Sequence, residues 1–329
     1  MTAERHLAGR AARPSPASIF LVMAFLIFVW SLNYIVAKIG LRELPDLALG
    51  SFRLVTAGIM SLPVLVFLRA GKRHNLKVQV EVSQKRKLHA LWTITYLAFF
   101  GVVLNQGGFT VGLNYTSVSH SSLIIGCAPI LILVFSWALR LEALTRRKAI
   151  GMAFAFAGAA VVAVEQSTNA WAGNFRGDLL TLVAGIGLAL YTVLGKREVA
   201  EHSPMRLSLL TNIAAAVLVS PIAIWQMDVL ARANRLGAIS LEAWGGVIYL
   251  GVLGSAVSYV LYFWALRYMT PARLGAVSYL QPIGAILLGL VLLGEPITRR
   301  VAVGGLLIIA GVYAIETHPH EPQPKEELA

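Results

Sequence analysis

The sequence predicts an all-α integral membrane protein with ten transmembrane helices, arranged as two inverted five-helix repeats. Three observations support this fold class. Of the 329 residues, 57% are hydrophobic and only 13% are charged, with a mean hydropathy of +0.71. The hydrophobic residues gather in separate runs, and part of the chain aligns with another part without a gap. Because a soluble domain usually carries about 25% charged residues, lipid is the expected solvent for this much apolar surface.

Ten apolar runs account for the expected helices, since crossing the hydrocarbon takes roughly 20 apolar residues. The expected spans cover residues 18–37, 47–68, 90–113, 119–139, 149–164, 179–195, 207–227, 243–266, 274–294 and 301–315. The first run follows three arginines, as a signal peptide would, but it lacks a small-residue cleavage site and is expected to remain as a helix. The two shortest runs, the fifth and the tenth, are rich in Gly and Ala, which favours close helix packing.

The spans divide the chain into tails, repeats and loops. We expect an N-terminal tail at 1–17, a first repeat at 18–165, a linker at 166–177, a second repeat at 178–316 and a disordered tail at 317–329. A basic loop at 71–88 lies within the first repeat. With the N-terminus in the cytoplasm, 20 of the 28 Lys and Arg residues face the cytoplasm. This bias predicts a plasma-membrane protein with both termini cytoplasmic, and it makes nucleic acid an unexpected partner.

The internal repeat appears when the chain is shifted against itself by 153 positions, which aligns residues 96–158 with 249–311. Conserved between the two copies are Gly101/Gly254, Tyr115/Tyr268, Pro129/Pro282, Glu142/Glu295 and the Thr-Arg-Arg runs that begin at 145 and 298. A unit of five helices is odd, so the second copy must enter the membrane in the opposite sense. Inverted repeats of this kind form the midplane sites of many secondary transporters.

Polar and aromatic side chains recur within five of the expected spans. They are Trp30, Asn33 and Tyr34 on the first; Asn105, Gln106 and Phe109 on the third; Tyr191 on the sixth; Tyr259 and Tyr262 on the eighth; and Tyr279 and Gln281 on the ninth. Such groups are costly against lipid and should line an interior cavity that suits a small amphipathic solute. The alternative is that they only join neighbouring helices.

Two prolines and two ionisable residues are further candidates. Pro129 and Pro282 fall near the centres of the fourth and ninth spans, where a missing N–H and a kink suit a gate, or else static curvature. Arg53 could attract a substrate carboxylate; the alternatives are snorkelling to the interface or a partner in the first loop such as Glu43 or Asp46. His120, at the start of the fourth span, is the candidate proton handle, although a lone His at this position can also be structural.

The sequence contains no recognisable motif of an enzyme or of a metal site. The sequence lacks HExxH, GxSxG and Walker motifs and has no clustered His and Asp set, so neither a metal nor another cofactor is expected. Every acidic residue lies in a loop or at a helix end, so no ion-coupling site stands out.

Residues 265–313, ALRYMTPARLGAVSYLQPIGAILLGLVLLGEPITRRVAVGGLLIIAGVY, closely resemble the second half of EamA-type transporters of the drug/metabolite transporter superfamily. The first half follows the same plan, with W-S-x-N-Y-I-V-A-K at 30–38 and SFRLV at 51–55, although Arg140-Leu141-Glu142 stands where the second half reads LLGE. The resemblance implies ten spans, cytoplasmic termini and transport of small metabolites.

These observations together predict a secondary transporter that exports small organic metabolites, such as amino acids, by alternating access around a central cavity. Its expected partners are a small-molecule substrate and the lipid bilayer. The first alternative is a flippase for lipids or lipid-linked sugars, and the second is a membrane-embedded enzyme.

Overall fold

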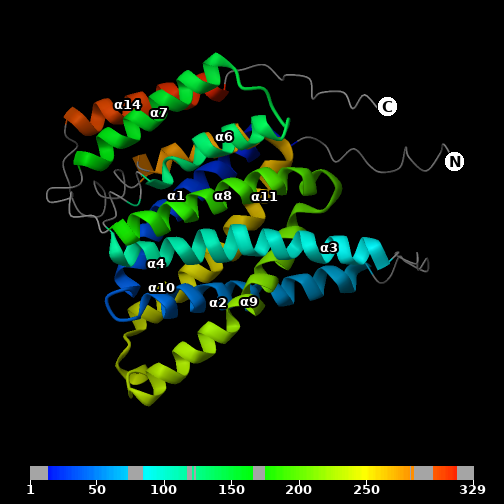
Figure 1. Cartoon of the computed structure of the whole chain (residues 1–329), viewed down its shortest axis with the longest axis vertical. Helices are drawn as coiled ribbons and strands as arrows, with labels where there is room; N and C mark the ends of the chain where they lie inside the picture. The colour runs from blue at the N-terminus through cyan, green and yellow to red at the C-terminus, as the bar shows by residue number, and fades with distance from the viewer. Residues whose placement is uncertain are drawn as a thin grey trace.

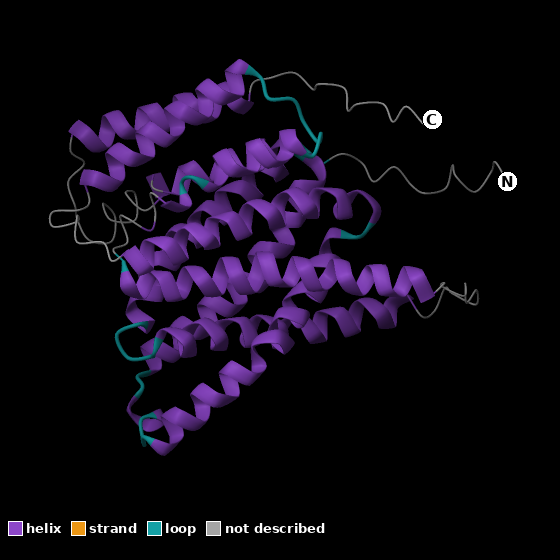
Figure 2. Ribbon diagram, viewed as in Figure 1, coloured by secondary structure: helices purple, strands orange, loops and turns teal. Residues whose placement is uncertain are grey.

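The computed structural model describes residues 14–72, 84–116, 121, 124–165, 175–281, 283–284 and 299–316. Within these residues every regular element is a helix, and no strand occurs (Figure 2). The elements are α1 (Pro16–Gly40), α2 (Asp46–Lys72), α3 (Gln84–Leu97), η3 (Ala98–Gly107), α4 (Gly108–Tyr115), α6 (Ala128–Ala138), α7 (Arg146–Glu165), α8 (Phe175–Glu201), α9 (Pro204–Arg232), η4 (Leu236–Ala238), α10 (Leu241–Gly251), η5 (Val252–Val257), α11 (Ser258–Tyr268), α12 (Pro271–Val277), η6 (Ser278–Leu280) and α14 (Arg299–Glu316).

Six helical segments are long and apolar enough to cross a bilayer. They are Pro16–Gly40, Asp46–Leu68, Leu88–Tyr115, Phe175–Ala200, Pro204–Arg232 and Leu241–Tyr268. Two shorter apolar helices, Ala128–Ala138 and Ala302–Ile315, lie in the fourth and tenth expected spans. The prediction of an all-helical, multi-pass membrane protein is therefore confirmed.

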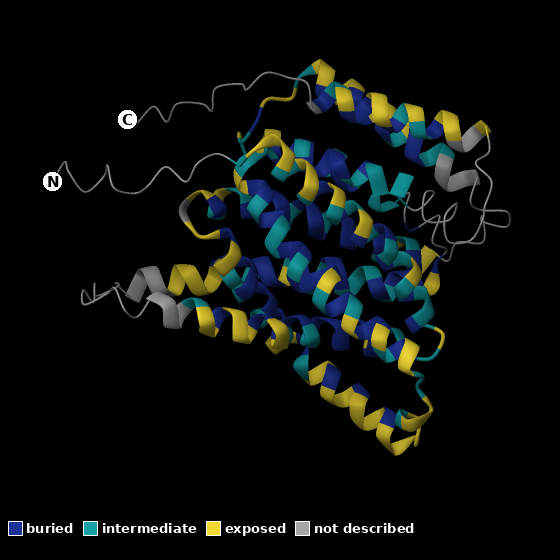
Figure 3. Ribbon diagram, turned by 180° about the vertical axis from the view of Figure 1, so that it is seen from behind, coloured by how far each residue is buried: buried dark blue, intermediate teal, exposed yellow. Residues whose placement is uncertain are grey.

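The outer surface of the bundle is apolar, as a lipid-facing surface must be. Phe67 is 79% exposed on α2, and Leu306 is 67% exposed on α14. Figure 3 shows exposed positions along the outer helices, whereas buried positions gather in the interior. Large side chains that would aggregate in water are stable here because hydrocarbon surrounds them.

Two long spans share an unusual feature, a π-helical segment at their centre. In α3–η3–α4 this segment is Ala98–Gly107, and in α10–η5–α11 it is Val252–Val257. The shift of 153 positions superimposes the second on the first. Gly101 lies in one segment and Gly254 in the other. Because π-turns interrupt the regular ladder and often mark functional sites, their recurrence at repeat-related positions points to this level of the bundle.

The α7–α14 pair packs backbone against backbone at the edge of the bundle (Figure 1). A Cβ added to Gly151 would lie 2.9 Å from the Gly311 carbonyl, and one added to Gly158 would lie 2.5 Å from the Gly304 carbonyl. Rising numbers on α7 meet falling numbers on α14, so the two helices run antiparallel. The predicted purpose of the Gly-rich short spans, close packing, is confirmed.

A buried carboxylate ties the turn before α7 to the start of α12. Glu142 accepts from Lys148 at 3.1 Å and from the backbone N–H of Ala272 at 2.8 Å. The N–H groups of a first helical turn have no partner within their own helix. Glu142 therefore satisfies one of them while Lys148 balances its charge.

Replacing Gly311 by Ala should destabilise the protein, because the new Cβ would meet the Ala155 nitrogen and the Gly151 oxygen, both at 2.5 Å. Overpacking of this kind typically costs about 1–3 kcal/mol. Gly305→Ala on the same helix is the matched control, since its Cβ would meet nothing within 4 Å. Thermal unfolding of the detergent-solubilised protein should show a lower midpoint for Gly311→Ala only. Equal midpoints for the two variants would contradict the packing.

A second carboxylate predicts an acid-dependent stability. Glu43 accepts from the N–H of Ser240 at 2.6 Å and from its hydroxyl at 2.7 Å. These two bonds, the backbone one first, lower the pKa of the Glu43 carboxyl below its ordinary value. A lowered folded-state pKa gives a stabilising contribution that is complete above the ordinary carboxyl pKa and is lost as the pH falls through the lowered value.

Glu43→Gln should therefore unfold at a lower temperature than the wild type at about pH 7, and the difference should shrink as the pH falls through the lowered pKa of the Glu43 carboxyl. Thermal unfolding across this range measures the difference. A gap that stays constant with pH would show that the bond to Ser240 does not depend on ionisation.

Candidate functional site

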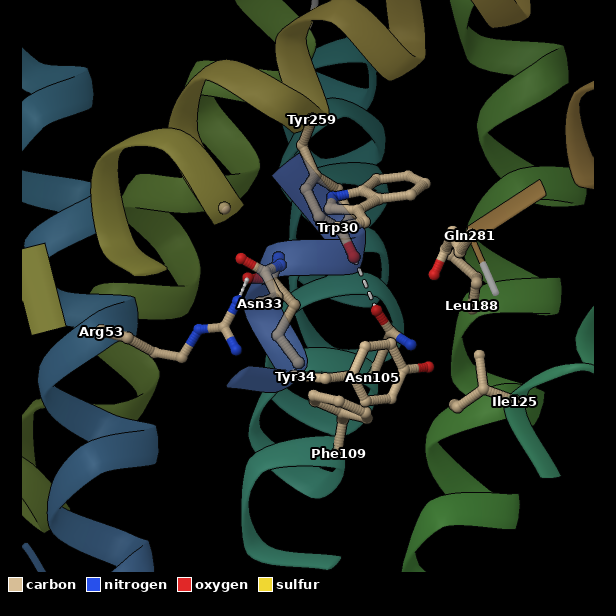
Figure 4. Close-up of a pocket in the computed structure, with 12 residues that line it drawn as sticks. Trp30, Asn33, Tyr34, Arg53, Asn105, Phe109, Ile125, Leu188, Tyr259 and Gln281 are labelled. Atoms are coloured by element: carbon tan, nitrogen blue, oxygen red, sulfur yellow. Dashed lines mark hydrogen bonds between the residues drawn. The ribbon is translucent and has the colours of Figure 1, made fainter. Parts of the chain in front are cut away.

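A cavity opens between α1, α2, the π-helical spans and α8 (Figure 4). Its empty volume is about 510 Å³, counting the part that opens to solvent. The lining residues are Trp30, Asn33, Tyr34, Arg53, Asn105, Gln106, Phe109, Ile125, Leu188, Gly254, Tyr259 and Gln281.

The structure brings together most of the side chains that the sequence singled out. Eight predicted cavity residues line the space: Trp30, Asn33, Tyr34, Asn105, Gln106, Phe109, Tyr259 and Gln281. Arg53, the candidate anion contact, lines it as well. These nine residues belong to the first, second, third, eighth and ninth expected spans. Their roles in binding stay predictions.

Three predicted tyrosines lie outside this lining. Tyr191 stacks on Phe263 with ring centroids 4.6 Å apart, and its ring occupies the space beside Gly101. The Tyr262 hydroxyl pairs with Thr192 at 2.6 Å, while Tyr279 is buried among α6, α7 and α14 side chains. These rings form packing behind the cavity wall, because each is held by a neighbouring helix.

Aromatic pairs form two walls of the cavity. Trp30 packs against Tyr259 with ring centroids 6.0 Å apart, and Tyr34 meets Phe109 edge to face at 5.1 Å. Figure 4 shows the first pair above the space and the second below it. The walls offer flat apolar contact that a ring or an alkyl chain could fill.

One hydrogen-bond chain fixes the third span against two neighbours. The Tyr259 hydroxyl donates to Asn105 Oδ1 at 2.6 Å, the bond drawn as a dashed line in Figure 4. The Asn105 amide donates in turn to the Ala184 carbonyl on α8 at 2.9 Å. Asn105 is thus held from both sides, which leaves the neighbouring Gln106 to face the polar end of the cavity.

Arg53 forms the polar end. It extends from α2 into the space, and its side chain is almost fully buried, with 2% of the residue exposed (Figure 4). Its guanidinium donates to Thr110 at 3.1 Å, Gln106 at 3.4 Å and Ser255 at 3.2 Å. All three acceptors are neutral. This geometry contradicts snorkelling, since a snorkelling Arg would place its charge at the interface.

Sequence reasoning missed three lining residues. Ile125 and Leu188 are apolar and carry no signal that separates them from lipid-facing positions. Gly254 was visible only as the repeat partner of Gly101. Its Cα approaches so near to Asn33 that an added Cβ would clash with the Asn33 amide oxygen.

The prolines and the histidine have different outcomes. Pro129 does not kink a continuous helix, because a turn at 126–127 ends the preceding helical segment and Pro129 sits in the first turn of α6. Proline is tolerated there since that N–H lacks a helical partner anyway. Pro282 and His120 lie outside the described residues.

Two lysines cap the C-terminal ends of the two π-helical spans in the same way. Lys38 on α1 donates to the Leu113 carbonyl at 2.6 Å, and Lys196 on α8 donates to the Leu266 carbonyl at 2.7 Å. Leu113 and Leu266 are 153 positions apart. Ammonium groups at helix C-termini satisfy carbonyls that have no helical partner and complement the helix dipole.

Both halves of the chain support the same family assignment. The EamA-like transporter family model matches residues 17–164 and again residues 175–317. The chain belongs to the EamA-like transporter family. It is thus a membrane transporter of the drug/metabolite superfamily, as its second-half motifs suggested.

Three relatives of this EamA protein illustrate the match, and each is named as a transporter. An uncharacterized transporter of Archaeoglobus fulgidus is 25% identical over 296 residues, covering 90% of this chain and 98% of the relative. Uncharacterized transporter YvbV of Bacillus subtilis is 25% identical, covering 90% of this chain and 91% of its own. Uncharacterized inner membrane transporter YedA of Escherichia coli K12 is 26% identical, with 83% and 82% covered.

A crystal structure of another protein has the same fold. Its TM-score is 0.66 at 19% sequence identity, and the match covers 92% of this EamA chain and 97% of that one. At this identity the likeness shows the fold alone.

Proposed function

We propose that this EamA protein is a secondary transporter that exports small organic solutes by alternating access, with the cavity lying between two inverted five-helix repeats. The observation that carries the proposal is the cavity itself. It is buried within the bundle, combines aromatic walls with a charged end, and draws its lining from both halves of the chain. A site at such an interface can be opened to either side when one half moves against the other.

Three pairs of contacts support the inverted repeat and its ten spans. The Gly151–Gly311 contact on α7 and α14 becomes the Gly304–Gly158 contact when each residue is replaced by its repeat partner. The two lysine caps are related similarly, since their acceptor carbonyls are 153 positions apart and the lysines themselves are 158 apart. The two π-segment glycines are repeat partners as well, and Gly101 faces Tyr191 on α8 as Gly254 faces Asn33 on α1.

Antiparallel packing of the repeat-related helices α7 and α14 is what opposite insertion of the two copies requires. A pseudo-two-fold axis in the membrane plane explains why each contact occurs twice. The proposed repeat boundaries, 18–165 and 178–316, follow from this arrangement.

The orientation is tested by tags at the two ends of the chain. We expect a reporter fused after residue 329 and one fused before residue 1 both to report a cytoplasmic location, since most basic residues flank that side. Reporters that are active only in the cytoplasm, compared with reporters active only outside it, measure this directly. Tags on opposite sides would contradict an even number of spans and, with it, the proposed pair of repeats.

Transport is tested with the purified chain in liposomes and a panel of amino acids, amino-acid analogues and cationic dyes. The wild type should move at least one solute, whereas Gln106→Ala and Tyr259→Ala should slow it by at least about fivefold. That factor corresponds to the loss of one hydrogen bond within the cavity. Tyr259→Phe separates the hydroxyl from the ring, because it removes the bond to Asn105 and keeps the aromatic ring.

Tyr313→Ala is the control, since Tyr313 is 66% exposed on α14 and is not among the residues that line the cavity. Normal transport by both cavity variants would show that the solute path lies elsewhere. Movement of labelled lipids without solute flux would favour the flippase alternative. Covalent conversion of a solute would favour a membrane-embedded enzyme.

A further inference from the structure

Arg53 is a buried cation whose described partners are all neutral. Across the part of the chain that the structure describes, no carboxylate comes within ion-pair distance of its guanidinium. Charged groups are almost never fully buried without a counter-ion, because removing a charge from water costs several kcal/mol that neutral contacts repay only in part. Among the described residues, the positive charge at the cavity therefore has no counter-ion.

The lengths of the guanidinium contacts show how incompletely that charge is satisfied. Donor–acceptor distances to Thr110, Gln106 and Ser255 are 3.1, 3.4 and 3.2 Å. Hydrogen bonds from Arg to an anion are usually about 2.7–2.9 Å and roughly twice as strong as neutral ones. In addition, Arg53 Nε has no partner in the described structure. The neighbours thus orient the guanidinium and leave binding capacity unused.

A second donor beside Arg53 is also unused. Gln106 turns its amide oxygen towards Arg53 and Ser255, so its amide nitrogen is left buried without a partner. Gln106 and Arg53 both line the cavity and are joined at its polar end by the 3.4 Å bond from the guanidinium to the Gln106 amide oxygen. Converging N–H donors around one cation are the arrangement that recognises a carboxylate or a phosphate.

The opposite side of the cavity is mainly apolar, although the Gln281 amide lies beside Leu188 there (Figure 4). Figure 4 shows Ile125 and Leu188 facing Arg53 across the space, with the aromatic pairs above and below. A ligand that fills this volume therefore needs one charged end and one hydrophobic body. A neutral solute would leave the guanidinium unpaired, and a cation would be repelled by it.

We propose that the cavity binds amphipathic organic anions, with Arg53 contacting a carboxylate or phosphate group and the apolar body lying between the aromatic walls towards Ile125 and Leu188. This assignment rests on the proposed transport function, since it names the chemical class of the transported solute. The anionic group is bound by Arg53 and by the Gln106 amide N–H.

Matched acid and amide pairs test the assignment without altering the protein. Isothermal titration of the full-length wild type in detergent would compare 3-phenylpropionate with 3-phenylpropionamide, and indole-3-acetate with indole-3-acetamide. We expect each acid to bind at least about tenfold tighter than its amide, the factor expected for one hydrogen bond to a charged group. Phenyl phosphate in a third arm distinguishes a phosphate site from a carboxylate site.

Variants connect the preference to one side chain. Arg53→Gln should reduce the acid-to-amide affinity ratio to about one, whereas Arg53→Lys should keep part of it, because an ammonium retains the charge but not the planar fork. Arg232→Gln is the matched control, since Arg232 is exposed and pairs with Asp228 at the end of α9. It should keep the wild-type ratio. Size-exclusion profiles establish that each variant remains folded.

Two results would overturn the proposal: an acid-to-amide ratio near one in the wild type, including no binding by either member of both pairs, or an unchanged ratio in folded Arg53→Gln. Should Arg53→Gln fail to fold, the wild-type ratio and Arg53→Lys still decide. Failure of the anion assignment is distinguishable from failure of transport, because a protein that moves neutral or cationic solutes in liposomes is a transporter without an anion preference.

Discussion

The absence of water inside the bilayer is the constraint on which this architecture depends. In hydrocarbon each backbone group needs a partner within the protein, and each polar side chain needs either a partner or an interior cavity. The protein meets this demand by turning Asn105, Gln106 and Arg53 inwards while exposing Phe67 and Leu306 to lipid.

Repeat-related contacts explain how helices with few strong interactions hold together. Lipid tails are as apolar as leucine, so hydrophobic burial does little to drive transmembrane helices together, and close van der Waals packing must replace it. Glycines at 151, 158, 304 and 311 supply that packing at the edge of the bundle. Lys38 and Lys196 add hydrogen bonds that tie helix ends to neighbouring spans. Each device occurs twice, as the proposed pair of repeats requires.

The sequence was sufficient to predict an all-helical, multi-pass membrane protein, since hydropathy alone determines which runs can lie in lipid. It also predicted most of the cavity lining, because Trp30, Asn33 and Tyr34 share one helical face. Tyr191 and Tyr262 were misplaced for a reason that periodicity cannot reveal: a face can point towards the interior and still be covered by a neighbour, here Phe263 and Thr192. The environment of Arg53 required tertiary structure, since its three partners come from two distant spans.

In the proposed transport cycle, a charged cavity behaves differently from a neutral one, because Arg53 has no counter-ion among the described residues. Closing both sides around an empty cavity would leave the Arg53 charge in a dry environment, where its desolvation is most costly. Closing around a bound anion neutralises that charge and strengthens the contact as water leaves. A ligand shifts a conformational equilibrium only by its differential affinity for the two states, and the buried guanidinium supplies such a difference. The same side chain that selects the solute would therefore favour closure of the loaded carrier over closure of the empty one.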